Sequence, residues 1–498
     1  MFSALARSAP VLLVLVGGLS SRPAQAVPRC DFYASAAGQG DGSSPEKAFR
    51  VDRFWSRSAP GQTLCLLDGV YRDAGSMIAP PSGLSGAPGL PITVRALHDG
   101  GVFIHGDGTR LPVRLLRNDW FVIEGLNACC SSGTVVELEY SNHNVIRRVA
   151  AWDSADGNNE IFGVHYDSNH NLLEDVAGWG IARKVYQSSQ GGNFTTIRRA
   201  WGRWEGSHVT GPKMVYTLAY NNFDMLVENS LGTWSGERMK ERYVLLDYYG
   251  KPWKGRLEGT YQDHDVNQPY AIFGVDANKK DKRAKARLLG SIAYVAASDS
   301  FKADRLVFFT KLDAVEIADT LAYVEPGSYP RVWTFGLYGL PSLTTSLKLH
   351  WPPGLPRSFG FDESASDSEG NAAVSLSVHN ITSLGGAGAF IAKEWQTRNV
   401  LQGPTTAVYG PSESAFHTTR GANLCFRYVD GVLTREPLWP WPMNQRILDA
   451  MLQSGRKPVD VTATIEKLLG KIPEACRGTP AEPGSTSAPL PSPPSPSR

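Results

Sequence analysis

One short phrase recurs along this chain and restricts what the chain can fold into. The stretches NVIRRVAAW (Asn144–Trp152) and NLLEDVAGW (Asn171–Trp179) both begin with Asn, end with Val-Ala-x-Trp and start 27 residues apart. Related copies occur at Phe121–Ala128, Thr195–Gly202 and Met225–Gly232. A recurring period in this range is typical of proteins that stack one small structural unit on the next.

Each copy is a short run of β-branched and apolar residues bounded by Gly, Asn, Asp or Ser, which indicates a strand. Steps of 23, 27, 24 and 30 residues fit the coils of a right-handed parallel β-helix, in which insertions fall in the turns. A β-propeller has a longer period, and a leucine-rich solenoid has a stricter leucine pattern. We therefore predict an all-β, right-handed parallel β-helix. Its apolar reference positions should stack in one inward-facing ladder: Ile123, Ile146, Leu173, Ile197 and Val227.

Both ends of the predicted β-helix carry helical patterns. Residues 43–62 combine a capping Ser, a Pro at the first helical position and an apolar face, which predicts an N-terminal capping helix. Residues 442–455 and 460–470 predict short helices in a C-terminal cap that protects the far end of the stack. The predicted organisation is a signal peptide (1–26), the β-helix with its cap (27–410), the C-terminal cap (411–476) and a disordered Pro/Ser-rich tail (477–498).

The N-terminus predicts export. One positive charge precedes an apolar core at Ala9–Leu19, and a small-x-small cleavage site ends at Ala26, so we expect a secreted or periplasmic protein. The apolar run is too short to span a bilayer, and no later stretch is long enough. The formal net charge of +2 gives no bias that would indicate a nucleic acid partner.

Export permits disulfides, and all six cysteines follow the predicted cleavage site. Four of them lie near the two ends of the fold and predict two bridges: Cys30–Cys65 and Cys425–Cys476. The adjacent Cys129 and Cys130 stay open between free thiols, core positions and a bridge between neighbours. No CxxC or Cys/His spacing suggests zinc.

The N-terminal segments Asp31–Phe49, Pro60–Asp73 and Gly86–Ala96 resemble secreted β-helix proteins of the pectin-lyase-like superfamily, and are similar to chondroitinase B and related alginate lyases. Leu438–Ile447 resembles a closing segment of the same group. The resemblance implies the fold and a polysaccharide partner. Those relatives place calcium-binding carboxylates and an Asn on adjacent coils with a Lys base and an Arg nearby, and Gly236–Val244 departs from that pattern.

The third and fourth coils are the richest in groups that a uronate lyase needs, namely a base, an acid and cations for the sugar carboxylate. We expect Lys184 or His208 to be the proton-abstracting base and Tyr216 or Lys213 to be the acid. Substrate-binding candidates are Arg183, Arg203, Trp204 and Glu205. The alternative is a solvated, charge-mixed face of the solenoid.

A second candidate site is the stretch WDSADGNNE, where oxygen-bearing side chains surround a Gly. The candidate metal ligands, with Ca²⁺ as the candidate ion, are Asp153, Asp156, Asn158 and Glu160. The stretch lacks EF-hand spacing, and a turn between strands has the same composition. No cofactor is assured by the sequence.

Two functions of different class remain. The first is a secreted, monomeric enzyme that cleaves an anionic polysaccharide by β-elimination. Hydrolysis is the variant of this function, and it needs paired carboxylates on one face. The second is a non-catalytic β-helix that binds glycan or forms part of a surface structure. An enzyme should gather its titratable groups on one face of adjacent coils, whereas a structural solenoid should spread them.

Overall fold

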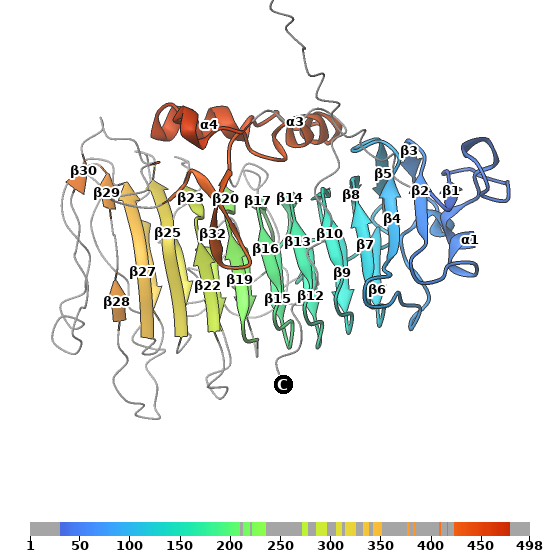
Figure 1. Ribbon diagram of the computed structural model, residues 1–498, viewed down its shortest axis with the longest axis horizontal. Coiled ribbons are helices and arrows are strands. Elements are labelled where there is room, and N and C mark those ends of the chain that lie inside the picture. The colour runs from blue at the N-terminus through green and yellow to red at the C-terminus, as the bar shows by residue number, and fades with distance from the viewer. Residues whose placement is uncertain are drawn as a thin grey trace, which may run out of the picture.

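The computed structural model describes residues 30–209, 213–219, 222–235, 271–276, 285–295, 305–310, 314–324, 332–337, 342–350, 376–378, 382–384, 408–409, 416 and 423–478. The chain forms a parallel β-helix. It passes in turn through three rows of strands, and each strand pairs in parallel with its counterparts one coil before and one coil after (Figure 1). The predicted parallel β-helix is confirmed.

The rows are named I, II and III in the order in which each coil visits them. Row I contains β1 (Phe32–Ala34), β2 (Thr63–Leu66), β4 (Ile92–Ala96), β7 (Phe121–Glu124), β10 (Val145–Arg147), β13 (Leu172–Glu174), β16 (Thr196–Arg198), β19 (Met225–Glu228), β22 (Lys285–Leu289) and β28 (Leu376–Val378). Row II contains β3 (Gly69–Tyr71), β5 (Val102–His105), β8 (Leu126–Cys129), β11 (Ala150–Trp152), β14 (Ala177–Ile181), β17 (Trp201–Gly206), β20 (Leu231–Trp234), β23 (Ile292–Val295), β29 (Thr382–Leu384) and β30 (Val408–Tyr409).

Row III is a separate sheet that contains β6 (Val113–Leu116), β9 (Val136–Glu139), β12 (Glu160–His165), β15 (Lys184–Ser189), β18 (Met214–Ala219), β21 (Ala271–Asp276), β24 (Arg305–Thr310) and β26 (Val332–Leu337). Two longer strands, β25 (Ala314–Val324) and β27 (Ser342–His350), run through rows I and II without a break in strand assignment.

The predicted apolar ladder is confirmed. In row I, Ile123 pairs with Ile146, and the ladder continues one coil at a time through Leu173, Ile197 and Val227. All five side chains are buried in the main core. A second ladder is aromatic: Phe162, Tyr186, Tyr216 and Phe273 of row III stack with ring centroids 4.7–5.0 Å apart. These four aromatic residues therefore stack inside the coil and stabilise its core.

The corner between rows I and II is built from residues in the left-handed backbone region. The same position in successive coils has φ between 46° and 79°, and it is occupied by Gly125, Arg148, Asp175, Arg199, Asn229, Gly290 and Asp319. This conformation costs a non-glycine residue on the order of 1 kcal/mol or more. Ionic contacts across the corner offset that cost, for example the 2.7 Å contact between Arg199 Nε and Asp175 Oδ1.

The N-terminal cap is helical as predicted, but the helix expected over residues 43–62 is divided into two short elements, and the side chain of Ser44 does not cap the first. A 3₁₀ turn η1 (Pro45–Lys47) leads into the short helix α1 (Val51–Trp55), and a second 3₁₀ turn η2 (Ala74–Ser76) follows β3. Phe54 and Trp55 of α1 pack on the first strands as part of the main core. The predicted Cys30–Cys65 disulfide is present and ties the start of the chain to β2.

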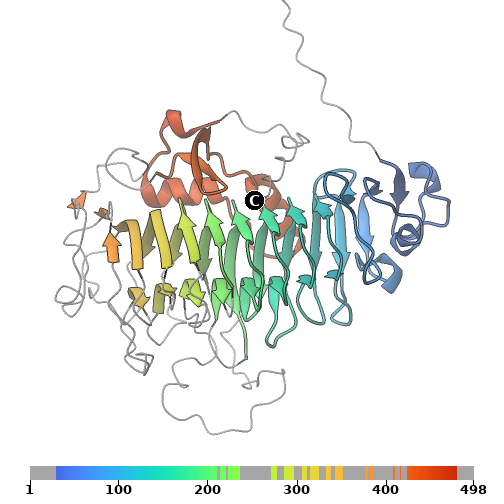
Figure 2. The ribbon, with the colours of Figure 1, turned by 60° about the horizontal axis from the view of Figure 1, so that its bottom comes forward.

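The two predicted C-terminal helices are present as α3 (Asn444–Gln453) and α4 (Val461–Leu469), followed by a 3₁₀ turn η6 (Glu474–Cys476). They follow an antiparallel hairpin of β31 (Phe426–Val429) and β32 (Val432–Pro437). Figures 1 and 2 show these helices along the flank of the coils instead of at the end of the stack. The prediction that they close the far end therefore needs correction. We call residues 423–478 the flank segment.

The outer face of row II explains the position of the flank segment. It carries Trp152, Trp179 and Trp201, which are buried and share one apolar cluster with Ile447 of α3 and Ile465 of α4. Burying a large apolar side chain contributes on the order of 2–3 kcal/mol, so this tryptophan stripe provides a strong driving force for docking. The predicted Cys425–Cys476 disulfide is present and joins the two ends of the segment.

Cys129 and Cys130 are bonded to each other, which decides among the alternatives that the sequence left open. No helix among the described residues is long and apolar enough to cross a membrane. The predicted signal peptide and Gly236–Val244 lie outside the described residues, as does nearly all of the predicted C-terminal tail.

Candidate functional site

Two of the predicted site residues lie inside the coil and cannot contact a polysaccharide. Trp204 is fully buried in the main core, where its Nε1 donates to the carbonyl of Ala182 (2.8 Å). Tyr216 belongs to the internal aromatic ladder, and its hydroxyl donates to the carbonyl of Ala200 (2.8 Å). Burial raises the pKa of Tyr216 well above its ordinary value. The roles predicted for Trp204 in substrate binding and for Tyr216 as an acid are therefore wrong.

Three further predicted residues lie beneath the flank segment. Arg203 forms an ion pair with Glu205, and Glu205 Oε2 also lies 3.1 Å from Nε of Arg456. Arg456 contacts Asp153 Oδ2 at 3.4 Å, while the other carboxylate oxygen of Asp153 accepts from the backbone of Ile181 (3.0 Å). These side chains hold the flank segment against the coils, so the structure assigns them to packing instead of to a sugar site.

Four other predicted residues lie in the turns between rows II and III and contact one another in pairs: Asp156 with His208, and Asn158 with Arg183. Asp156 accepts hydrogen bonds from Ser207 Oγ (3.1 Å) and from the backbone N–H of His208 (2.8 Å), and it forms an ion pair with the imidazole of His208. Asn158 Oδ1 accepts a hydrogen bond from the guanidinium of Arg183. The loop after β11 therefore contacts both of the coils that follow it. Asn158 contacts Arg183 of the next coil, and Asp156 contacts His208 of the coil after that.

The predicted calcium loop is not formed. Among the described residues, the carboxylates of Asp153, Asp156 and Glu160 do not come together as a group that could hold a metal ion. Each is engaged elsewhere, and Glu160 Oε2 accepts from Thr134 Oγ1 (3.0 Å). The composition of the loop reflects a turn that joins coils, which was the alternative reading.

Lys184 and Glu160 lie on a different part of the molecule, at the start of two row III strands. They are register partners in β15 and β12. Lys184 Nζ donates to Gln187 Oε1 (2.6 Å), and Gln187 faces away from the core because its neighbours Tyr186 and Val185 face inward. Lys213 is also buried, one residue before β18. The outer face of row III is therefore the surface on which chemically active groups of neighbouring coils meet.

Strand alternation places two carboxylates and an arginine on this face. In β9, Val136 and Leu138 point into the core, so Glu137 and Glu139 point outward. Arg114 of β6, one coil earlier, is the register partner of Glu137. Its Nε lies 3.2 Å from Glu137 Oε2 and its Nη2 lies 2.6 Å from Glu139 Oε2. One guanidinium thus bridges both carboxylates.

The next coil adds a histidine that leans over a glycine. Gly163 is the register partner of Glu137, and a Cβ atom there would lie 2.4 Å from His165 Nε2. The missing side chain leaves room for the imidazole, whose Nε2 lies 3.4 Å from Glu160 Oε2 and whose Nδ1 lies 2.8 Å from Ser189 Oγ. We call the set formed by Arg114, Glu137, Glu139, Glu160, Gly163, His165, Lys184 and Gln187 the row III face.

Thr217 of β18 continues this outward line as the register partner of Gln187. Its side chain is 2% exposed, and its hydroxyl oxygen has no hydrogen-bond partner within the part of the chain that the structure describes. A buried hydroxyl without a partner costs roughly 1–3 kcal/mol.

The environments of the carboxylates differ. Burial, followed by the negative charge of Glu139, raises the pKa of Glu137 to about 7, while the charges of His165 and Arg114 act to lower it. Burial also acts to raise the pKa of Glu160, but the hydrogen bond and charge of His165 and the charge of Lys184 outweigh it, so that pKa is lowered. Near neutral pH Glu137 is therefore about half protonated, whereas Glu160 is ionised.

Accessibility divides the row III face into two parts. The side chains of Glu137 and Glu139 are 16% and 15% exposed, and Arg114 is more exposed still. His165, Glu160 and Lys184 are nearly or fully buried. Sequence reasoning found Lys184 and Glu160 but missed Glu137, Glu139 and His165. The alternation of Glu with Val and Leu in VVELEY (Val135–Tyr140) is the signal that could have found the two glutamates.

Comparison with solved structures finds distant relatives of the fold. The chain is similar to pectate lyase Pel9A (13% identity over 68% of this chain and 78% of that chain, TM-score 0.41). It is similar to an alginate lyase from Paenibacillus sp. str. FPU-7 (13% identity, 64% and 96% covered, TM-score 0.42). It is also similar to XylC in complex with xylose (8% identity, 76% and 86% covered, TM-score 0.47). No family model matches the chain, and no curated protein does. Similarity this distant assigns no activity.

Proposed function

We propose that this chain is a polysaccharide-cleaving enzyme and that the row III face is its active site. The observation that supports this most directly is the pair Glu137 and Glu139, two carboxylates on the same face of one strand, bridged by Arg114. The Cα atoms of residues two apart on a strand are roughly 7 Å apart, and glycoside hydrolases use two carboxyl groups that flank the glycosidic bond.

The two carboxyls suit different roles. Glu137 has a pKa of about 7, so near neutral pH it carries a proton that it can donate to the glycosidic oxygen. Glu139 accepts a hydrogen bond from Arg114 Nη2 (2.6 Å), and in our proposal it is the base or nucleophile. Different environments can give two neighbouring carboxyl groups these two roles.

The buried part of the face positions this pair. His165 lies over Gly163 beside Glu137, and its Nδ1 and Nε2 are fixed by Ser189 and Glu160. Because Gly163 has no side chain, the imidazole approaches the strand closely. We therefore assign His165 and Glu160 to positioning Glu137 and to setting the charge around it.

The charge of the face favours hydrolysis of a neutral sugar chain. Its three carboxyl groups, Glu137, Glu139 and Glu160, lie beside two fixed cations among the described residues, Arg114 and Lys184. Arg114 is already bound to two carboxylates, and Lys184 donates to Gln187. An anionic uronate would therefore find little positive charge to neutralise it, and that neutralisation is the first requirement of β-elimination.

A polysaccharide lyase acting by β-elimination on a uronate-containing glycan is the second candidate. It is favoured by Lys184 and His165, which supply a cation and a base on the same face of adjacent coils. This candidate retains Lys184 from the sequence prediction and replaces His208, which pairs with Asp156 in a turn. Export of the chain as a secreted or periplasmic protein remains our proposal for either activity, and three disulfides support it.

The product distinguishes the two chemistries. The protein is incubated with a panel of neutral and uronate-containing polysaccharides, and both new reducing ends and the ultraviolet absorbance of unsaturated sugars are measured. Hydrolysis gives reducing ends without absorbance, whereas elimination gives both. Binding without any cleavage would contradict the enzyme and favour the non-catalytic glycan-binding alternative.

Variants test the assignment of Glu137. We expect Glu137→Gln to lower kcat by roughly 10²–10⁴-fold while the protein stays folded. Glu124→Gln is the matched control, because Glu124 is a half-buried glutamate at the end of a row I strand. Activity that needs protonated Glu137 should be retained below neutral pH and fall as the pH rises through about 7. Full activity of Glu137→Gln on a substrate that the native chain cleaves would refute the assignment.

A further inference from the structure

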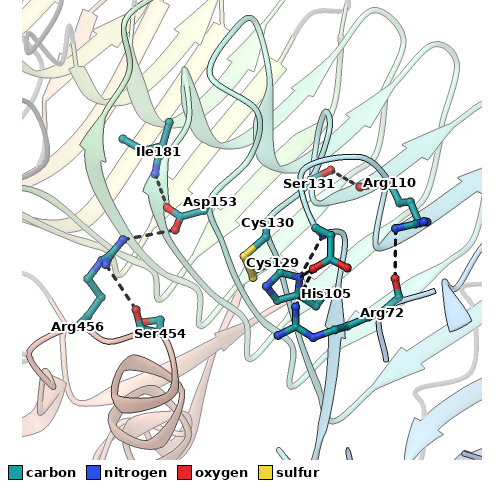
Figure 3. The surroundings of a disulfide bond; sticks show 11 residues. Arg72, His105, Arg110, Cys129, Cys130, Ser131, Asp153, Ile181, Ser454 and Arg456 are labelled. Carbon is teal, nitrogen blue, oxygen red and sulfur yellow. Dashed lines mark hydrogen bonds and ion pairs between the residues drawn. A yellow bond between two sulfur atoms is a disulfide. The ribbon is translucent and has the colours of Figure 1, made fainter. Parts of the chain in front are cut away.

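The ends of β5 and β8 bring together three potential metal ligands that are distant in the sequence. His105 and Cys129 are register partners one coil apart, and Cys130 follows directly. The ligand atoms of these three residues all lie within 4.8 Å of one another. Figure 3 shows the imidazole beside the two bonded sulfur atoms. This cluster belongs to row II of the stack and is separate from the row III face.

The imidazole of His105 is held in the way that metal-binding histidines usually are. Its Nδ1 lies 2.7 Å from Oδ1 of Asp107, and the same oxygen lies 2.7 Å from Nη1 of Arg72 (Figure 3). The backbone N–H of Asp107 donates to the same Nδ1 (3.1 Å), so Asp107 fixes the orientation of the ring through two contacts on that side and leaves Nε2 as the ligand in our proposal. This arrangement is an observation independent of the two cysteines.

The two sulfur atoms are not thiolates in this state, because Cys129 and Cys130 are bonded to each other. We propose that this disulfide is a redox-gated site for a soft divalent metal such as Zn²⁺, which Cys129, Cys130 and His105 bind only after the bond is reduced. Oxidised, the cluster cannot offer sulfur ligands. Reduced, it offers two thiolates and one imidazole.

The chemistry balances as follows. A thiol or phosphine reductant gives two electrons to the disulfide, and two protons from water complete the two thiols while the reductant is oxidised. Zn²⁺ then displaces both thiol protons and binds the two Sγ atoms and Nε2. Zinc with three protein ligands keeps a fourth position for water. Cys130 is half-buried, so a small reductant in solution can reach its sulfur, whereas Cys129 is buried.

The test uses the full-length chain, reduced with a water-soluble phosphine and titrated with Co²⁺ under anaerobic conditions. We expect one equivalent to give the thiolate-to-cobalt absorption band and a visible spectrum of tetrahedral type, both displaced by Zn²⁺. The Cys129→Ser/Cys130→Ser and His105→Ala variants should lose or alter these bands. Asp107→Asn should weaken binding by about 10–100-fold.

His98 provides a matched control. Its Nδ1 lies 2.9 Å from Asp68 Oδ2, so it is also a histidine held by an aspartate, but it is exposed and belongs to no metal-ligand group among the described residues. His98→Ala should leave the cobalt bands unchanged. Absence of the bands in folded, reduced protein, or their survival in Cys129→Ser/Cys130→Ser, would overturn the proposal.

A second measurement covers the case in which long reduction unfolds the chain. The protein is reduced briefly, its thiols are alkylated with and without Zn²⁺, and the labels at positions 129 and 130 are quantified by mass spectrometry. Zn²⁺ should protect both thiols at least tenfold in the native sequence and in His98→Ala, and protection should be lost in His105→Ala. Equal labelling with and without Zn²⁺ would refute the site.

Discussion

Glu174 is the residue whose replacement should cost the coils most. It lies at the end of β13 on the outer face of row I and is 7% exposed. Its carboxylate accepts from Arg147 Nε (2.8 Å), Arg198 Nε (2.6 Å) and Arg199 Nη2 (2.6 Å), and all three arginines are buried. Glu174→Gln keeps the shape and removes the charge that these guanidinium groups share.

The structure gives the magnitude in two ways. Removing one partner of a buried ionic contact leaves uncompensated charge and costs about 3–5 kcal/mol. Independently, burial acts to raise the pKa of Glu174, but the charges of Arg199, Arg198 and Arg147 outweigh it and lower the pKa from 4.5 to about 2. A fall of that size corresponds to about 3 kcal/mol of unfolding free energy at neutral pH. We therefore expect Glu174→Gln to lower the unfolding free energy by about 3 kcal/mol.

The contribution of Glu174 to the unfolding free energy should decrease as the pH falls. The folded-state pKa of Glu174 lies below the unfolded one, so the ionised carboxylate stabilises the fold fully above about pH 4.5 and loses this effect as the pH falls toward 2. Urea unfolding followed by circular dichroism should show the full difference between native chain and variant at neutral pH. At about pH 3 the difference should be under half as large.

Glu436→Gln is the control for this experiment. Glu436 is 67% exposed and lies 3.8 Å from Arg427, and an exposed pair of this kind contributes roughly 0–1 kcal/mol. A loss below about 1 kcal/mol in Glu174→Gln, or a loss that does not change with pH, would refute the reasoning. It would show that Glu174 does not balance the three buried guanidinium groups.

Two further predictions concern the row III face and the flank segment. Gly163→Ala should displace His165 and reduce cleavage by about a hundredfold with little change in melting temperature. The control Gly478→Ala should leave cleavage unchanged, because its new Cβ would have no neighbour nearer than 3.7 Å. Equal effects of the two substitutions on cleavage would contradict the placement of the imidazole. Replacing Cys425 and Cys476 by Ala removes a bridge across a sequence separation of 51, worth about 4 kcal/mol in the chain-entropy model, so limited proteolysis should release the flank segment sooner. An unchanged rate would contradict this.

The fold could be predicted because a solenoid repeats its sequence signal. The apolar position shared by Ile123, Ile146 and Leu173 recurs once per coil, and the structure stacks these side chains in register. The position of the flank segment could not be predicted in the same way. It depends on contacts between parts of the chain hundreds of residues apart, such as Arg446 Nη2 donating to Asn127 Oδ1 (2.9 Å).

The site was predicted less well because strand alternation breaks at one place in each coil. Val215 and Tyr216 are consecutive, yet both face the core, and so do Val185 and Tyr186. The repeat period therefore did not show which face of β18 carries Tyr216. An irregularity in the pairing of β14 with β17 after Gly180 also shifts the register. Such bends depend on how successive coils pack, and the sequence period carries no signal for them.

The position of the flank segment also has a consequence for biosynthesis. The segment covers tryptophans on coils that leave the ribosome hundreds of residues before it does, and Arg446 contacts Asp99 across a sequence separation of 347. At roughly 5–20 residues per second, the stretch from Trp201 to the end of the flank segment takes about 14–55 seconds to translate. Throughout that time the earlier coils present the bare stripe of Trp152, Trp179 and Trp201. Chaperone binding or delayed coil formation must therefore keep the nascent chain from aggregating until its final segment arrives.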